Sequence, residues 1–342
     1  MTAEARVSKE SEPVSGPTIS VAMSVHNNAP HLAPAIESIL AQTFGDFEFL
    51  IVNDGATDGS GAIIDAYAAR DERIRAIHQE NRGLIASLNR LLNEARAPLV
   101  ARMDGDDIAL PARFERQLAF LHAHPNHGVV GTWTLDIDET GGPRAETPRD
   151  QPTSHEAVIA TLETVNPLCH PSVMMRRDAV LAAGGYHAGY RHCEDYDLWL
   201  RMSESTRLCS IPERLMLYRH SASQVSNRHI LAQAIGAAIA WLAHVERREG
   251  RPDPTENLAT LPPIGQLDDL FGRRGIDAAV RAKVAASIVH SPLALRGEGY
   301  QLLLDHVRTG GAKAGLWRTA GRLVKFREPA RALRLAAALA VR

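Results

Sequence analysis

From residue 19 onward, short apolar runs alternate with segments in which apolar side chains recur every three or four positions. Residues 19–25 are the first apolar run and predict a buried strand, and residues 32–40 then place their apolar side chains on one face of a helix. Further strands are predicted at residues 47–52, 73–78 and 98–103, with helical patterns between them. This order predicts an α/β fold, in which a parallel sheet carries helices on both faces and ligands bind at the carboxyl ends of the strands.

The pattern divides the chain into three parts. Residues 1–17 carry charge and proline without an apolar core, so we expect a disordered leader and not an export signal. Residues 18–228 hold the alternating elements, together with a loop or lid rich in Gly, Pro and charge at 138–153. Residues 229–342 are rich in Ala and Leu at helical spacing and show no obvious chemistry, which predicts a helical C-terminal appendage.

Composition narrows the class of protein. Of the 342 residues, 45% are apolar and 23% charged, ordinary values for a globular protein with a large core. The net charge of −2 gives no overall reason to expect a nucleic-acid partner. Cys169, Cys193 and Cys209 lack C-x-x-C spacing, which argues against a disulfide framework or a cysteine-rich zinc site. No apolar stretch approaches the roughly 20 residues that cross a bilayer. We therefore expect a cytoplasmic protein.

Three carboxylates, Asp104, Asp106 and Asp107, follow the apolar run that ends the fourth strand. Carboxylates this close together repel one another unless a cation or hydrogen-bond donors neutralise them. A hard divalent ion such as Mg²⁺ or Mn²⁺ prefers oxygen ligands, and Gly105 allows the tight turn that aims them. The alternative is a solvated Asp-Gly turn without a ligand.

A second polar cluster, residues 53–59, follows the second strand. Asp54 can accept hydrogen bonds from a nucleotide base or a sugar hydroxyl, whereas a plain βα turn capped by Thr57 or Asp58 is the alternative. His26 ends the first strand on the same rim, although a lone His is more often structural than functional. Because the chain has neither G-x-G-x-x-G nor a P-loop, dinucleotide enzymes and ATPases are disfavoured, and phosphate would be held mainly by metal.

The third cluster is the sequence E-D-Y-D-L-W-L-R at residues 194–201. Leu198 and Trp199 can pack while one acid faces a cleft and accepts a proton from an attacking hydroxyl. The alternative is a helix start, where acidic residues are favoured by the helix dipole. The chain contains no G-x-S-x-G elbow and no H-E-x-x-H, so a serine hydrolase and a zinc protease are poorly supported.

Taken in order, these motifs resemble the family 2 inverting glycosyltransferases, which have the GT-A fold. The resemblance covers residues 19–226, about 60% of the chain, and leaves the C-terminal third outside. Its specificity comes from several moderate motifs in the expected order. They are residues 21–28, 38–44, 46–48, 53–59, 101–107, 170–172 and 194–201.

The resemblance implies a nucleotide-sugar donor along the strand ends, with UDP as the expected nucleotide. By position, Ser24 and His26 correspond to contacts with the base and ribose, although Tyr is more usual at the position of His26. Asp54 would hold the base and Asp104 the ribose region. Asp106 would hold the Mn²⁺ or Mg²⁺ that bridges the diphosphate. The sheet would then be a Rossmann-like nucleotide-diphospho-sugar transferase sheet flanked by helices.

The same resemblance implies the residues of the acceptor side. Asp195 matches the catalytic base, which would activate an acceptor hydroxyl for a single in-line displacement and so invert the anomeric configuration. His170, Glu194 and Trp199 would lie beside the acceptor or support the residues that touch it. The family often has Tyr-Arg-x-His after the base, but here His follows the Arg directly, so Arg219 is the candidate phosphate contact.

The expected reaction moves a sugar to a hydroxyl of a glycan or lipid-linked acceptor, in bacterial surface polysaccharide synthesis. A nucleotidyltransferase is one alternative, but residues 26–30 are not the Gly-rich, Arg- or Lys-bearing loop it would need. A non-catalytic glycan- or partner-binding module is the other.

Residues 312–342 hold eight basic residues against one acid. This segment can lie peripherally on the inner face of the membrane, or it can be a solvated face of a packed helix.

Overall fold

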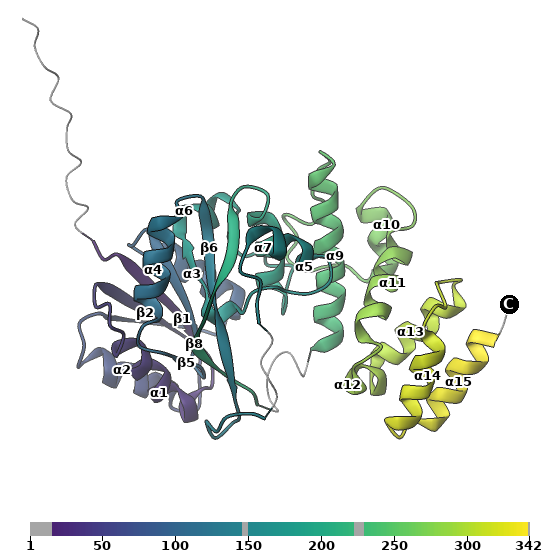
Figure 1. Cartoon of the computed structure of the whole chain (residues 1–342), viewed down its shortest axis with the longest axis horizontal. Helices are drawn as coiled ribbons and strands as arrows, with labels where there is room; N and C mark the ends of the chain where they lie inside the picture. Colours follow the sequence, from purple (N-terminus) through teal and green to yellow (C-terminus); the bar gives the residue numbers. More distant parts are fainter. Residues whose placement is uncertain (1–15, 146–149, 222–228, 341–342) are drawn as a thin grey trace, which may run out of the picture.

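A computed structural model describes residues 16–145, 150–221 and 229–340. The predicted leader therefore lies almost wholly outside the described residues, as do parts of the predicted loop at 138–153 and of the segment after Tyr218. Figure 1 shows a sheet covered by helices, followed by a row of helices that leads away from it to the C-terminus. The α/β prediction and the helical C-terminal region are both confirmed.

The sheet has eight strands in the order β3-β2-β1-β4-β7-β6-β8-β5. They are β1 (Ile19–Val25), β2 (Phe47–Asp54), β3 (Ile74–Gln79), β4 (Leu99–Asp104), β5 (Ile108–Ala109), β6 (His127–Ile137), β7 (Met174–Arg176) and β8 (Arg207–Arg219). β1 pairs in parallel with both β2 and β4, so the carboxyl ends of these three strands meet at one edge.

The sheet is mixed, with a parallel part, β3-β2-β1-β4, as the alternation of strands and helices favoured, and antiparallel pairs beyond it. The three-residue strand β7 runs antiparallel to both of its neighbours, β4 and β6. Directly before β7, His170–Ser172 form a short 3-10 helix that turns the chain into the sheet. Apolar runs reveal strands but not their direction, because direction is set by pairing between distant segments.

Helices cover both faces of the sheet, and each face has its own apolar core. One core includes Leu32 and Phe114, from α1 (Ala29–Leu40) and α4 (Arg113–Ala123), together with Ile64 from α2 (Ser60–Ala68). The other includes residues of several helices before the C-terminal region. These are α3 (Leu84–Glu94), α5 (His155–Leu162), α6 (Arg177–Ala182) and α7 (Glu194–Met202).

The C-terminal region begins with α9 (Ile230–Arg248), whose Ile239 is buried in the same core as Trp199 of α7. The remaining helices are α10 (Leu267–Leu270), α11 (Ile276–Ile288), α12 (Pro292–Arg296), α13 (Glu298–Arg308), α14 (Leu316–Lys325) and α15 (Pro329–Ala340). Residues of α10, α11 and α12, such as Leu267, Val280 and Ala294, belong to the core of Trp199 as well, so the C-terminal helices pack onto the helices that cover the sheet. The last three helices share a separate core with Ala285 of α11 and Leu295 of α12. Within the described ranges, every helix is too short or too polar to cross a bilayer.

Candidate active site

The carboxyl ends of β1, β2 and β4 open into one cavity of about 1710 Å³. The start of α7 and the turn before β7 border the same space. All but two of the residues predicted from the sequence line this cavity. They are Ser24, His26, Asp54, Asp104, Asp106, His170, Glu194 and Asp195.

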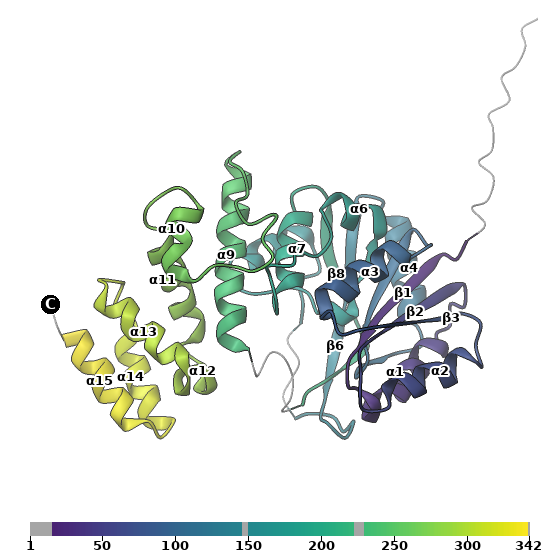
Figure 2. The same ribbon diagram turned by 180° about the vertical axis from the view of Figure 1, so that it is seen from behind.

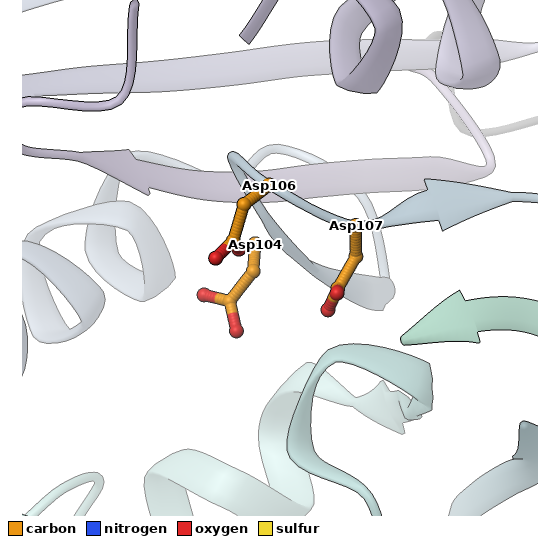
Figure 3. Close-up of side chains that lie close together, drawn as sticks. All are labelled: Asp104, Asp106 and Asp107. Carbon is orange, nitrogen blue, oxygen red and sulfur yellow. The ribbon is translucent and has the colours of Figure 1, made fainter. Parts of the chain in front are cut away.

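Asp104, Asp106 and Asp107 form a compact carboxylate cluster where β4 ends. One oxygen from each side chain lies within 4.8 Å of the others, and Figure 3 shows the three side chains projecting from the same turn. Three carboxylate oxygens at this spacing are a donor set that fits a hard divalent cation, which prefers oxygen ligands. The structure therefore brings Asp107 into the candidate metal site beside the predicted Asp106.

The electrostatics of the cluster point the same way. Burial, followed by the charge of Asp104, raises the pKa of Asp106 to about 6. Burial and the two neighbouring acids also hold the pKa of Asp107 well above its usual range. The buried guanidinium of Arg102 forms an ion pair with Asp104, so one cation already faces the cluster. Without further positive charge, the ionised forms of the remaining two acids are disfavoured.

Arg219, predicted as a phosphate contact, lies behind the cavity surface and is only 6% exposed. Its backbone N–H donates to Oδ1 of Asp107 over 2.8 Å, and its Nε donates to the carbonyl of Asp106 over 2.7 Å. Nη1 donates to the carbonyls of Asp138 and Glu139, both over 3.1 Å. These bonds hold the carboxylate turn against the end of β8.

Asp54 organises the rim that follows β3. Its carboxylate accepts hydrogen bonds from the side chain of Gln79 and from the backbone N–H groups of Arg82 and Gly83, at 2.7–2.9 Å. A carboxylate has about four acceptor positions, so roughly one remains for a ligand. Gly55 has φ +68°, and a Cβ there would lie 2.6 Å from the backbone nitrogen of Asn81. The absence of a side chain at Gly55 therefore lets the turn after β2 lie against Asn81, in the segment after β3.

Residues 81–83 line the cavity, and sequence reasoning missed them. Asn81 Nδ2 lies 3.1 Å from Nδ1 of His26, and that ring nitrogen lies 2.9 Å from the carbonyl oxygen of Asp54. Asn81, His26 and Asp54 thus form one connected polar surface over the ends of β1 and β2. A signal was present, because the polar run at 79–83 directly follows a predicted strand, where ligand-binding residues are expected.

The first turn of α7 carries three acids with different surroundings. Asp195 accepts a hydrogen bond from the Asn166 amide over 2.6 Å and one from the Tyr196 N–H over 2.8 Å. Burial raises the pKa of Asp195, and burial with the charge of Asp195 raises the pKa of Glu194 to about 7. Asp197 is fully buried and pairs with Arg201 over 2.6 Å, so it has a structural role.

His170 and Trp199 lie together behind the acids of α7. Nε2 of His170 lies 2.8 Å from the hydroxyl oxygen of Tyr186, and its ring contacts the Trp199 ring edge-to-face with centroids 6.0 Å apart. Burial lowers the pKa of His170 well below its usual value, so the ring is neutral at pH 7. Trp199 is fully buried and packs beneath the cavity-lining His170.

The C-terminal region forms one wall of the same cavity, which sequence analysis did not predict. The lining there comes from α9 and the segment after it: Ala232, Gln233, Ile235, Gly236 and residues 259–264. A Cβ on Gly236 would lie only 2.3 Å from Sγ of Cys193, the residue immediately before Glu194. Close contact with α9 therefore positions the start of α7.

The fold has clear structural relatives among enzymes that bind nucleotide sugars. The chain superposes on the mannosyltransferase PcManGT from Pyrobaculum calidifontis in complex with GDP-Man and Mn²⁺, with a TM-score of 0.52, 15% identity, and coverage of 95% of this chain and 88% of that one. It also superposes on S. aureus TarS 1–349 in complex with UDP-GlcNAc, with a TM-score of 0.54, 14% identity and coverage of 94% and 88%. The fold is therefore the GT-A glycosyltransferase fold.

Sequence comparison adds the family. The model of "Glycosyl transferase family 2" matches residues 20–184. The putative glycosyltransferase EpsE of Bacillus subtilis (strain 168) is 38% identical over 234 residues, which cover 67% of this chain and 82% of EpsE. The amylovoran biosynthesis glycosyltransferase AmsE of Erwinia amylovora is 33% identical over 213 residues, covering 61% and 79%. The chain belongs to glycosyl transferase family 2 and is a glycosyltransferase, as its motifs predicted.

Proposed function

We propose that this glycosyltransferase moves a sugar from a nucleotide-diphosphate donor, with UDP as the nucleotide, to a hydroxyl of a glycan or lipid-linked acceptor, with inversion. One observation carries the proposal: the carboxylate cluster after β4 and Asp195 of α7 line one cavity. The names of AmsE and of the O-antigen biosynthesis glycosyltransferase WbnJ of Escherichia coli, 33% identical over 205 residues, support a role in bacterial surface polysaccharide synthesis.

The donor would lie along the ends of β1, β2 and β4. Asp104, Asp106 and Asp107 would hold a divalent cation, Mn²⁺ or Mg²⁺, which when bound would stabilise the negative charge of the departing diphosphate. Asp54 has acceptor capacity left for the base, and Ser24 lines the same cavity. The structures of TarS with UDP-GlcNAc and of PcManGT with GDP-Man and Mn²⁺ support this assignment.

Asp195 would be the general base. As the acceptor oxygen attacks the anomeric carbon, its proton passes to the Asp195 carboxylate and the bond from that carbon to the phosphate oxygen breaks. The nucleotide diphosphate leaves with the electron pair, and the single displacement inverts the anomeric centre. A carboxylate whose pKa is raised by burial is a stronger base than an exposed one, which suits proton abstraction near neutral pH.

The acceptor would enter against the wall made by α9 and residues 259–264. This wall presents Ile235, Leu261 and Ile264 together with the polar side chain of Gln233. His192, at the cavity rim, stacks on His229 with ring centroids 3.9 Å apart, which joins the segment before α7 to the start of α9.

We place the reaction in the cytoplasm, and the three free cysteines are consistent with a reducing compartment.

A panel of nucleotide sugars tested with Mn²⁺ would examine the proposal by thermal shift and by donor hydrolysis. One UDP-sugar should raise the melting temperature and be consumed, because a ligand that binds only the folded state stabilises it by a few kcal/mol at saturation. Asp195→Asn should keep that stabilisation and lose transfer, whereas the exposed Asp269→Asn should change neither. Retention of full transfer by Asp195→Asn, or a product that keeps the donor's anomeric configuration, would contradict the mechanism.

A further inference from the structure

Helix α14 has one face buried and the other unpartnered. Leu316, Ala320 and Leu323 are buried in the core shared with α13 and α15. On the outer side, the side chains of Trp317 and Val324 are 56% and 58% exposed. Residues seven apart in a helix lie on nearly the same side, because two turns take about seven residues. Trp317 and Val324 therefore form an apolar row that faces outward.

A basic row runs beside this apolar row. Arg318 and Lys325 are both exposed and are also seven residues apart, so each directly follows one of the exposed apolar residues. The next helix, α15, repeats the pairing, because Leu333 is 74% exposed and the following Arg334 is exposed. Figures 1 and 2 show α14 and α15 side by side at the end of the molecule farthest from the sheet.

Charge along the chain is strongly asymmetric. Residues 312–342 contain eight of the 38 Lys and Arg and one of the 40 Asp and Glu, which gives this segment a net charge of +7. The preceding 311 residues therefore carry −9. An anionic surface would attract the α14–α15 end and repel the remainder, so the charge distribution would orient the molecule during approach.

We propose that the outer faces of α14 and α15 dock on an anionic lipid bilayer. Exposed Trp, Val and Leu beside Arg and Lys match the interface of such a bilayer, where apolar side chains enter the headgroup boundary and cations meet lipid phosphates. A nucleic-acid backbone would pair with the basic row but would leave Trp317, Val324 and Leu333 exposed to water. A second copy of this end would bring two segments of net charge +7 together, which is unfavourable.

Vesicle co-sedimentation of the full chain tests the docking surface directly. The wild-type protein should sediment with phosphatidylcholine vesicles that contain phosphatidylglycerol and remain in solution with phosphatidylcholine alone. Arg318→Gln/Lys325→Gln should weaken binding by about tenfold or more, since each basic residue near an anionic surface contributes substantially. Trp317→Ser/Val324→Ser should weaken it similarly. Arg70→Gln/Arg248→Gln removes the same charge from exposed positions elsewhere and should bind like wild type.

Tryptophan fluorescence checks that the apolar row enters the bilayer. The anionic vesicles should shift the emission to shorter wavelength, and Trp317→Phe should bind while losing most of the shift. Stabilisation by UDP and Mn²⁺ should be unchanged in every variant, so failure of this proposal is distinguishable from failure of the proposed reaction. The docking proposal is overturned if the wild-type protein does not bind anionic vesicles, or if Arg70→Gln/Arg248→Gln weakens binding as much as Arg318→Gln/Lys325→Gln does. It is also overturned if the protein binds a DNA duplex instead of the vesicles and that binding survives Trp317→Ser/Val324→Ser.

Discussion

The side-chain amide of Asn166 donates to Oδ2 of Asp195 over 2.6 Å, from the loop between α5 and the turn that precedes β7. This hydrogen bond favours the charged carboxylate and so opposes the rise in the pKa of Asp195 that burial causes. Asn166→Ala should therefore raise the pKa of Asp195 further. We expect the acidic limb of the kcat profile to move up by about one to two pH units, because a hydrogen bond to a charged group contributes roughly 1.5–3 kcal/mol.

The measurement is a pH–rate profile at saturating donor and acceptor. Asn93→Ala, which changes an exposed asparagine on α3, is the matched control and should leave the profile in place. A shift of the acidic limb to lower pH in Asn166→Ala would contradict the assignment of Asp195 as the base.

Glu194 should make the folded protein less stable at neutral and alkaline pH than at acid pH. Burial and the charge of Asp195 raise its pKa from 4.5 to about 7, so the folded state holds the proton more tightly than the unfolded chain does. Stability contributed by the protonated form is therefore lost as pH rises from about 4.5 to about 7. Glu194→Gln should stabilise the protein by on the order of 3 kcal/mol at about pH 8, with the gain vanishing below about pH 4.5.

Denaturant unfolding of both proteins across this pH range, in EDTA, measures the difference. The exposed Glu256→Gln is the control and should show no such pH-dependent gain. An unchanged or lower stability of Glu194→Gln at high pH would show that the charged Glu194 is well accommodated by its surroundings.

The acidic parts of the site could be predicted because their signal is local. Asp104, Asp106 and Asp107 directly follow an apolar strand, and Glu194 and Asp195 open a helix, so a short window of sequence shows both the charge and its place at an element end. The family motifs then supplied roles for these positions. The alternation of strands and helices likewise follows from periodicity within each segment.

The remaining parts depend on contacts between distant residues. The direction of β7 is decided by its pairing with β4 and β6, and the sequence of its three residues does not indicate that direction. The wall formed by α9 depends on Gly236, where the absence of one Cβ allows contact with Cys193, 43 positions earlier in the sequence. Arg113 is fully buried and its Nη2 donates to the carbonyls of Arg102 and Val173, which ties β4 to the segment before β7. In the sequence it resembles any polar helix residue.

Gly236 should be needed for activity although it lies outside the region that the family model matches. In Gly236→Ala the new Cβ would lie 2.3 Å from Sγ of Cys193, so either α9 or the start of α7 must move. We expect a loss of about 1–3 kcal/mol in stability and a fall in kcat of roughly tenfold or more, because Asp195 follows Cys193 by two positions.

A double variant separates this contact from a general effect of alanine in a helix. Cys193→Ala removes the sulfur, after which the nearest remaining Cys193 atom, Cβ, is 3.8 Å from the new methyl position, so Gly236→Ala/Cys193→Ala should recover most of the loss. Gly321→Ala on α14, where a Cβ would have no atom within 4 Å apart from the helix's own backbone and the two neighbouring residues, should be neutral or slightly stabilising. Equal losses in the single and double variants would mean that another contact decides the effect.

Divalent cation binding should depend on the carboxylate cluster and be detectable without catalysis. In the presence of UDP, Mn²⁺ should raise the melting temperature of the wild-type protein, and EDTA should reverse the rise. Asp106→Asn should weaken Mn²⁺ binding by at least about tenfold in calorimetric titration, whereas Asp269→Asn should match wild type. Because protons compete with the metal and the pKa of Asp106 is raised to about 6, affinity should fall as pH drops below that value. Mn²⁺ affinity that is unaffected by both Asp106→Asn and acid would place the cation elsewhere.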